Sequence, residues 1–428
     1  MRRTDGSGDA KVVVFGTHEG RTSPETRPQA HAAILRWMSE LLDVAAAMTP
    51  EIVRLRRNFH RFPELSYVEH ATSRTIREYL EGLGLTVHQG DSTGMWADLD
   101  TPGTTKRVAF RADMDALAMD EVETPNKSGF TSENEGAAHC CGHDAHMAML
   151  LAAARLLATD QAPRSHNVRF VFQHAEERAP GGAIDLIEQG CLEGVDEIYG
   201  MHVIPPLPAG RFSLRAGAFM AAADELKILV RGKGGHAAYP HLLQDPVVAA
   251  SQIVMALQTL VSRRTSPLES LVVSIATIRG GTGTTNVIPD EVELKGTVRT
   301  LDAELHARAP DWIREVVTHT ASAAGCRAEI GYVRGYPVLV NDADATERGK
   351  RAVRELFGET GFVPRSEPWM GGEDFARYAE RRPACFAFLG VGNEAKGIVA
   401  PNHATNFDVD EEALWRGTAW FLKLADLA

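Results

Sequence analysis

The sequence has few cysteines and no recognisable secretion signal. It contains five cysteines among 428 residues, an odd number without the spacing of a secreted disulfide framework. Its N-terminal segment has two arginines but no apolar region followed by a small-residue cleavage site. We therefore expect reduced thiols and a cytoplasmic location.

Long apolar runs and an excess of positive charge are also lacking. No run approaches the ~18 apolar residues that a membrane-spanning helix needs. The net charge of -12 argues against nucleic acid or an anionic membrane as a partner. A small-molecule or peptide substrate fits this composition better.

What is present is typical of a globular protein. Hydrophobic residues make up 44% and charged residues 24% of a chain long enough for two or three domains. Residues 1–30 are rich in Gly, Ser, Thr, Pro and charge without periodicity, so we expect a flexible extension. Apolar residues at helical spacing predict helices in 31–48 and 49–66, with Thr49 and Pro50 as start signals.

Apolar strands and helices alternate in the next part of the chain. Strands are expected at 107–115, 167–177 and 197–203, separated by helical stretches at 147–158 and 182–189. This alternation predicts an α/β fold with a mostly parallel sheet.

The pattern changes at residue 219. Between 219 and 331 the predicted elements follow the order β-α-β-β-α-β, so we expect an inserted ferredoxin-like α+β domain there. The larger, α/β domain then comprises 31–218 and 332–428. Its second part contains a predicted helix at 342–357 and a strand at 384–392.

Cysteine, histidine and carboxylate side chains gather in four short segments near predicted strand ends. These segments are HCCGHDAH at 139–146, QHAEE at 173–177, GMHV at 200–203 and PNHATNFD at 401–408. Open α/β sheets bind ligands beyond the carboxyl ends of their strands. The mixed donor set suits Zn, Mn, Fe, Co or Ni and selects no single metal.

The pair Glu176 and Glu177 directly follows a predicted buried strand. Neighbouring side chains on an extended segment point in different directions, so one carboxylate can bind metal while the other faces a metal-bound water. Metal-dependent hydrolysis requires both a metal ligand and a base that takes the proton of the metal-bound water. An acidic pair is more often simply exposed, but the preceding apolar strand favours a functional role.

A resemblance to a known family extends over these segments. Further matching motifs are RADMDAL, GKGGHAAYPH, GGTGTTNVIPDEVELKGTVRT, MGGEDFA and FLGVGN. In order from about residue 51 to the C-terminus, they resemble metallopeptidase family twenty, the aminoacylase and carboxypeptidase superfamily. The similarity is strongest to its amidohydrolase branch of hippurate and auxin-conjugate hydrolases.

The resemblance implies roles for individual residues. It implies two divalent metal ions per subunit, with Mn or Zn preferred and Co or Ni as alternatives. The implied ligands are Cys141, His143, Glu177, His202 and His403. Glu176 would be the general base, which takes a proton from metal-bound water and passes it to the leaving amine, and Asp115 would orient a metal ligand.

Some neighbours of these residues have less defined roles. Cys141 is preferred to Cys140 as the ligand because the branch pattern is Cys-Gly-His-Asp. Cys140 would then pack or support the ligands, and Asp113 and His146 would lie near the site. The branch usually has Pro where this chain has His174, and Ser-Pro or Asn-Pro after the last histidine, where this chain has Ala-Thr.

The resemblance also assigns residues of the inserted domain, which would act as lid and dimerisation domain. His236 would stabilise the oxyanion in the site of the other subunit of a homodimer, and Asn286 would contact substrate. From the sequence alone, His236 and the glycines of GGTGTTN would be assigned to turns.

The leading hypothesis is a metal-dependent amidohydrolase that cleaves the C–N bond of an N-acyl or aryl-acyl amino acid, not an ordinary protein peptide bond. The runner-up is hydrolytic deamination of an electron-poor aromatic amine such as a nitroaminobenzoate, since the scaffold also resembles 5-nitroanthranilate aminohydrolase. Two other classes remain as alternatives. One is a thiol-dependent hydrolase with Cys141 as nucleophile, and the other is a catalytically silent scaffold.

Overall fold

The computed structural model describes residues 40–364 and 366–427. The predicted extension at 1–30 and the first part of the predicted helix at 31–48 lie outside the described residues. Residues 41–47 are helical, and α2 (Thr49–Arg61) follows. This helix ends two residues before Pro63, because proline disfavours helical geometry in the residue that precedes it.

A seven-stranded sheet organises one part of the described chain. Its strands are β1 (Thr86–Gln89), β2 (Met95–Leu99), β3 (Arg107–Asp113), β4 (Asn167–Gln173), β5 (Glu197–Pro208), β6 (Phe212–Ser213) and β15 (Ala384–Gly392). They lie in the order β1-β2-β4-β3-β5-β15-β6, and the four from β4 to β15 are parallel. Every residue of β4 is buried, as in a strand covered on both faces.

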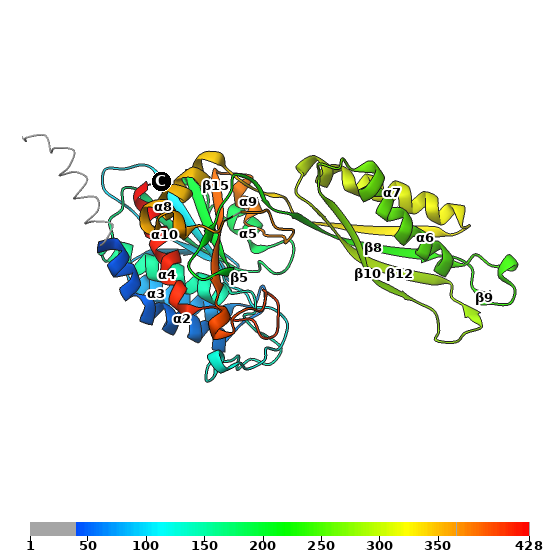
Figure 1. Cartoon of the computed structure of the whole chain (residues 1–428), viewed down its shortest axis with the longest axis horizontal. Coiled ribbons are helices and arrows are strands. Elements are labelled where there is room, and N and C mark those ends of the chain that lie inside the picture. The colour runs from blue at the N-terminus through cyan, green and yellow to red at the C-terminus, as the bar shows by residue number, and fades with distance from the viewer. Residues whose placement is uncertain (1–39, 365, 428) are drawn as a thin grey trace, which may run out of the picture. The chain divides into compact units, whose positions relative to one another are not determined.

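Helices cover both faces of this sheet (Figure 1). Besides α2 they are α3 (His70–Gly82), α4 (His143–Ala158), α5 (Gly182–Glu188), α8 (Ala343–Phe357), α9 (Ala376–Ala379) and α10 (Trp415–Leu427). Helices α5 and α9 lie on one face and the others on the opposite face. Helix α4 begins at His143, before the predicted start at residue 147, so its first turn includes two histidines of the HCCGHDAH segment.

A second, four-stranded sheet follows the ferredoxin-like order. Its elements are β8 (Ala222–Arg231), α6 (Pro246–Thr259), β10 (Leu271–Gly280), β12 (Glu291–Thr300), α7 (Ala303–Ala323) and β13 (Arg327–Tyr336). The strands pair antiparallel in the order β10-β12-β8-β13, and both helices share one apolar core with them. The predicted fold class is confirmed. The predicted domain limit after residue 331 falls within β13, and the division into domains stays a prediction.

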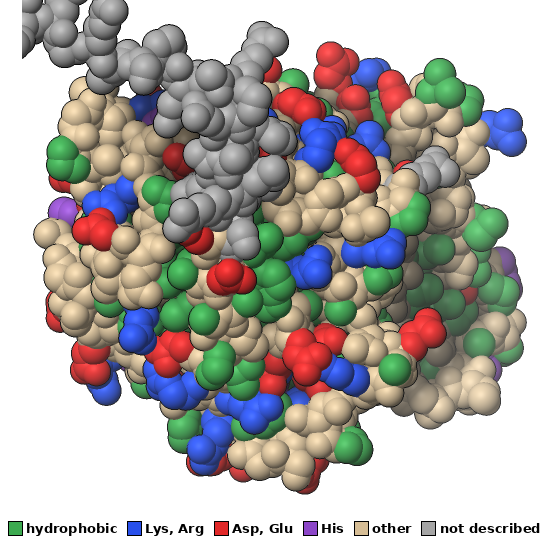
Figure 2. All heavy atoms as spheres, turned by 60° about the vertical axis from the view of Figure 1, so that its left-hand side comes forward, with side chains coloured by type: hydrophobic (Ala, Val, Ile, Leu, Met, Phe, Trp, Pro, Cys, Tyr) green, Lys and Arg blue, Asp and Glu red, His purple; other side chains and the backbone are tan. Residues whose placement is uncertain are grey.

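Two short strand pairs complete the fold. Strand β7 (Gly217–Met220) pairs with β14 (Leu339–Asn341), and β9 (Gly235–His236) pairs with β11 (Val287–Ile288). On the face that Figure 2 presents, acidic and basic side chains are interspersed. Among the described residues, no helix is both long and apolar enough to cross a membrane. All five cysteines are free thiols.

Candidate metal centre and active site

Strand, helix and loop residues at one edge of the seven-stranded sheet bring the five predicted ligands together. These are Cys141, His143, Glu177, His202 and His403. Donor atoms of Cys141, His143 and His202 lie within 4.8 Å of one another. A second group, which satisfies the same limit, joins Cys141 to Glu177 and His403. The two groups therefore overlap at the cysteine, an arrangement suited to two cations that share a thiolate.

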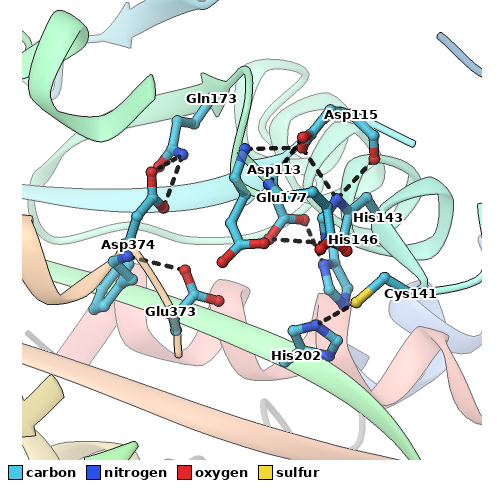
Figure 3. Close-up of polar contacts among 12 residues, drawn as sticks. Asp113, Asp115, Cys141, His143, His146, Gln173, Glu177, His202, Glu373 and Asp374 are labelled. Carbon is cyan, nitrogen blue, oxygen red and sulfur yellow. Dashed lines mark hydrogen bonds and ion pairs between the residues drawn. The ribbon is translucent and has the colours of Figure 1, made fainter. Parts of the chain in front are cut away.

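Close contacts join members of these two groups, and Figure 3 shows the one between Cys141 and His202. Cys141 Sγ is 3.2 Å from His202 Nε2. Glu177 Oε1 lies 3.3 Å from His403 Nε2 and 3.9 Å from His143 Nε2. These residues come from segments far apart in the sequence, so only the folded chain forms the group.

Backbone carbonyls fix the tautomers of two histidines. His143 Nδ1 donates to the carbonyl of Asp115 at 2.8 Å, and His202 Nδ1 donates to the carbonyl of Val203 at 2.9 Å. A carbonyl oxygen can only accept, so each Nε2 remains an unprotonated donor atom in the neutral ring. His143 Nε2 and Glu177 Oε1 are buried without a hydrogen-bond partner, which is how atoms that await a cation would be placed.

The electrostatics of the cluster also favour a cation. Burial opposes protonation of His143, but the carboxylates of Asp113, Asp115 and Glu177 outweigh it and raise its pKa to about 10. Burial, reinforced by Glu177, raises the pKa of the Cys141 thiol well above its usual value. A bound divalent cation would supply the missing positive charge and hold the thiolate. The donor set therefore fits divalent transition metals.

Asp115 organises the loop that contains both glutamates. Its Oδ1 accepts from the backbone N–H of Glu176 at 3.0 Å, and its Oδ2 accepts from that of Glu177 at 2.9 Å. The Ser66 hydroxyl also donates to Oδ2 at 2.6 Å. The residue that was expected to orient one ligand thus contacts two glutamates, and through its carbonyl it contacts His143 as well.

Other residues hold the same loop, and no local motif indicated them. Ala175 adopts a left-handed φ of 51°, and its N–H donates to Glu69 Oε1 at 2.8 Å. Thr93 donates to the other oxygen of Glu69 at 2.6 Å. The Tyr336 hydroxyl, at the end of β13, donates to the carbonyl of Glu176. These contacts restrict a turn that would otherwise be strained.

A cavity of about 420 Å³ opens above this loop. Glu176 lines it and is nearly fully buried. Burial raises the pKa of the Glu176 carboxyl well above its usual value, and Glu373 and Glu177 add to the shift. Of the predicted ligands, Cys141, Glu177, His202 and His403 also line this cavity.

Asp113 and His146 lie beside the ligands but are otherwise engaged. His146 Nδ1 donates to Asp113 Oδ1 at 2.6 Å, and His146 Nε2 accepts from the N–H of Val203 at 2.9 Å. Both ring nitrogens are thus used, which argues against His146 as a ligand. Asp113 also accepts from Arg111 at 2.6 Å.

The structure shows the surroundings of Cys140 and His174, whose roles the sequence left open. Cys140 is buried, and its carbonyl accepts from the N–H of His403 at 2.7 Å. His174 Nε2 lies 3.1 Å from Asp185 Oδ2, and its ring packs edge-on against Tyr67 at 5.6 Å. Neither side chain lines the cavity.

The structure does not bring His236 or Asn286 to the cavity of their own chain. Both are exposed, and they lie beside the short β9 and β11 pair, where Ala237 N–H donates to the Asn286 carbonyl at 3.0 Å. The four-stranded sheet contributes another residue that sequence reasoning missed. Arg299, on β12, lines the cavity.

Comparison with known proteins decides the family. The model of peptidase family M20/M25/M40 matches residues 109–427. The chain belongs to this family. The predicted family is therefore confirmed, and the matched region includes every predicted ligand.

Several members of the M20 family are similar over most of the chain. Thermostable carboxypeptidase 2 from Saccharolobus solfataricus is 39% identical over 86% of this chain and 92% of its own. IAA-amino acid hydrolase ILR1-like 4 from Arabidopsis thaliana is 39% identical over 87% of this chain and 84% of its own. The crystal structure of the Bacillus subtilis YXEP protein, a dinuclear metal binding peptidase from the M20 family, has a TM-score of 0.75 at 34% identity, and the match covers 89% of this chain and 97% of that one. The protein is accordingly an enzyme, a metal-dependent amidohydrolase.

Proposed function

We propose that the protein hydrolyses the amide bond of an N-acyl amino acid with an aryl-acyl or similar acyl group. The support comes from the cavity, which joins the glutamate pair to one cationic side chain and an apolar wall. Its volume of about 420 Å³ suits a small conjugate rather than a folded protein.

Arg299 is the observation on which this proposal depends. Its Nε donates to Thr297 Oγ1 at 3.0 Å, and no carboxylate among the described residues forms an ion pair with it. Burial lowers the pKa of this half-buried guanidinium, and the charges of Asp224 and Glu225 oppose that shift without forming an ion pair among the described residues. Such a guanidinium is suited to a substrate carboxylate, because its forked N–H groups match both oxygens. The free carboxylate of an acyl amino acid supplies this partner.

The apolar wall suits the acyl group. Ile204, Met220 and Trp369 line the cavity together. The Trp369 ring packs against Phe388, with 4.8 Å between centroids, which restrains its orientation. An acyl group bound there would be shielded from water near the buried glutamate.

The residues that would hold two divalent cations are Cys141, His143, Glu177, His202 and His403, with Mn or Zn as the preferred metals and Co or Ni as alternatives. When bound, the cations would polarise the amide carbonyl and make water more acidic. Glu176 accepts the proton of the attacking water. Asp115 keeps Glu176 in place through the backbone N–H.

The proposal includes a homodimer and a cytoplasmic location. His236 and Asn286 are exposed and lie outside the cavity lining of their own chain, as residues that complete a neighbouring site would. His236 would stabilise the oxyanion and Asn286 would contact substrate in that site.

The test is a substrate screen with metal-loaded protein. N-benzoyl amino acids, small peptides and nitro-substituted aminobenzoates are incubated separately, and amino acid and ammonia release are measured. We expect amino acid release from the N-benzoyl amino acids. Arg299→Ala should raise the KM for these substrates by about tenfold or more, and it should leave the KM for an acyl amide without a carboxylate unchanged. Ammonia release from aminobenzoates alone would contradict the proposal and support deamination.

Two further measurements test the assigned chemistry. Glu176→Gln should abolish turnover while bound metal per chain stays near that of the wild type. A chelator should abolish activity, and added metal should restore it. Activity that survives complete metal removal would favour the Cys141 thiol as nucleophile instead.

A further inference from the structure

Glu373 places a second buried carboxyl in the same cavity as Glu176. It lies in the MGGEDFA segment, between β14 and α9, and lines the cavity although only 1% of its surface is exposed. One oxygen each of Glu176, Glu373 and Asp374 lies within 4.8 Å of the other two. The mechanism above uses Glu176 and leaves the other two without a role.

One oxygen of Glu373 is fixed by the protein. Its Oε1 accepts from the backbone N–H of Phe375 at 2.9 Å and lies 3.0 Å from Arg111 Nη2. No described residue bonds to Oε2, which leaves that oxygen free at the cavity wall. Figure 3 shows a hydrogen bond to one oxygen of the Glu373 carboxyl and none to the other.

Asp374 is different, because both of its oxygens are bound. Gln173 Nε2 donates to Oδ1 at 2.9 Å and to Oδ2 at 2.7 Å. Arg111 and the N–H of Ala183 provide further bonds at 2.7 Å and 3.1 Å. Asp374 therefore anchors Arg111 beneath the cavity, and of the two only Glu373 offers a free oxygen.

Glu373 also lies on the side of the cavity where the amino acid would bind. A Cβ at the neighbouring Gly372 would lie 3.3 Å from Arg299 Nη1. Arg299 is proposed to bind the carboxylate of the substrate. The amide nitrogen of the substrate is attached to the carbon next to that carboxylate, so it lies on the same side of the cavity as Glu373.

We propose that Glu373 is a catalytic residue, the general acid that protonates the leaving nitrogen through Oε2. This inference rests on the proposed amide hydrolysis, and it assigns to Glu373 the second task that was expected of Glu176. As the new C–O bond forms, one O–H bond of water breaks and Glu176 takes that proton. As the C–N bond breaks, Glu373 gives its own proton to nitrogen, and the amine leaves neutral. Glu176 then returns the water proton to Glu373, so one water is consumed and both carboxyls are restored.

The surroundings keep Glu373 protonated near neutral pH, as a general acid requires. Burial raises the pKa of this carboxyl, Arg111 lowers it, and Asp113 and Asp374 raise it again, to about 8 in sum.

The test compares two leaving groups in Glu373→Gln. One substrate is an N-benzoyl amino acid, whose amine must be protonated to leave. The other is the benzoyl ester of a carboxylated nitrophenol, which leaves as an anion. We expect kcat/KM to fall at least about 100-fold for the amide and less than about fivefold for the ester. Glu176→Gln should lose both activities, because water activation precedes either departure.

The experiment distinguishes failure of the role of Glu373 from failure of the proposed amide hydrolysis. Equal losses of kcat/KM on both substrates, or no loss on the amide, would overturn the role of Glu373. A wild type that hydrolyses no acyl amino acid would instead overturn the proposed function. Partial misfolding of Glu373→Gln would reduce both rates equally, so the ratio of the two remains informative. Glu380→Gln is the matched control, since that exposed carboxylate faces Arg377 at 3.4 Å and should leave the ratio unchanged.

Discussion

Asp115 Oδ1 accepts a hydrogen bond from the backbone N–H of Glu176 at 3.0 Å. Its other oxygen accepts from the next N–H along the chain, at 2.9 Å. One buried carboxylate thus sets the backbone of both glutamates, the one assigned as base and the one assigned as ligand. Small displacements of a catalytic group reduce rates strongly, so this contact has a measurable consequence.

Asp115→Asn should lower kcat by about 10- to 100-fold, since supporting residues of metal sites have effects of this size. The amide has one oxygen, so its NH2 group would face a backbone N–H and push the loop away. Steady-state kinetics and bound metal per chain check this. Ser66→Ala is the control, because it removes only one of the three bonds that Asp115 accepts. Equal effects of both variants would contradict the assigned role.

His403→Ala should reduce bound metal from about two toward about one ion per chain, because the group of Cys141, His143 and His202 stays intact. Elemental analysis after gel filtration measures this. His319→Ala removes an exposed histidine on α7 and should leave the metal content unchanged. Full metal content in His403→Ala would exclude this histidine from the ligand set.

Mixed dimers test whether His236 acts in the neighbouring site. Glu176→Gln and His236→Ala are each expected to be inactive alone. After subunit exchange in equal amounts, half of the dimers should be mixed, each with one complete site, so about a quarter of wild-type activity should return. No recovery in verified mixed dimers, or full activity of a verified monomer, would show that the histidine does not act in trans.

Glu69 predicts a pH dependence of stability. Burial raises the pKa of this carboxyl to about 7, and Asp115 adds to the shift while the Thr93 hydroxyl opposes it. The folded-state pKa is therefore higher than the usual value of 4.5. The contribution of neutral Glu69 to the free energy of unfolding is fully present below about pH 4.5, and it is lost as the pH rises through about 7.

Glu69→Gln retains an acceptor for the N–H of Ala175 and cannot ionise. Its free energy of unfolding should match that of the wild type at about pH 4 and exceed it at about pH 8, by at most about 3 kcal/mol. Urea unfolding at both pH values measures the difference. A wild type and variant with parallel pH profiles would contradict the raised pKa.

The sequence predicted the layers of the fold because local patterns indicate them directly. The apolar run at 167–173 forms a buried strand, and the periodic stretch at 343–357 forms an amphipathic helix. The start of α4 was missed because Gly142, with φ 107°, turns the chain just before His143. Polar residues at a helix start do not show the apolar periodicity from which a helix is predicted.

The sequence by itself determined the α/β order of elements and the cluster of thiol, imidazole and carboxylate groups beyond the strands, since both are written in neighbouring residues. Tertiary structure alone decided which atoms of that cluster remain free for a cation. It also decided that Glu69, Arg299, Tyr336 and Glu373 belong to the site. Glu69 contacts Ala175, Tyr336 contacts Glu176, and Glu373 contacts Arg111, all distant in the sequence, so no local pattern indicates these contacts. Their roles follow from burial and hydrogen bonding, which exist only once distant segments have packed together.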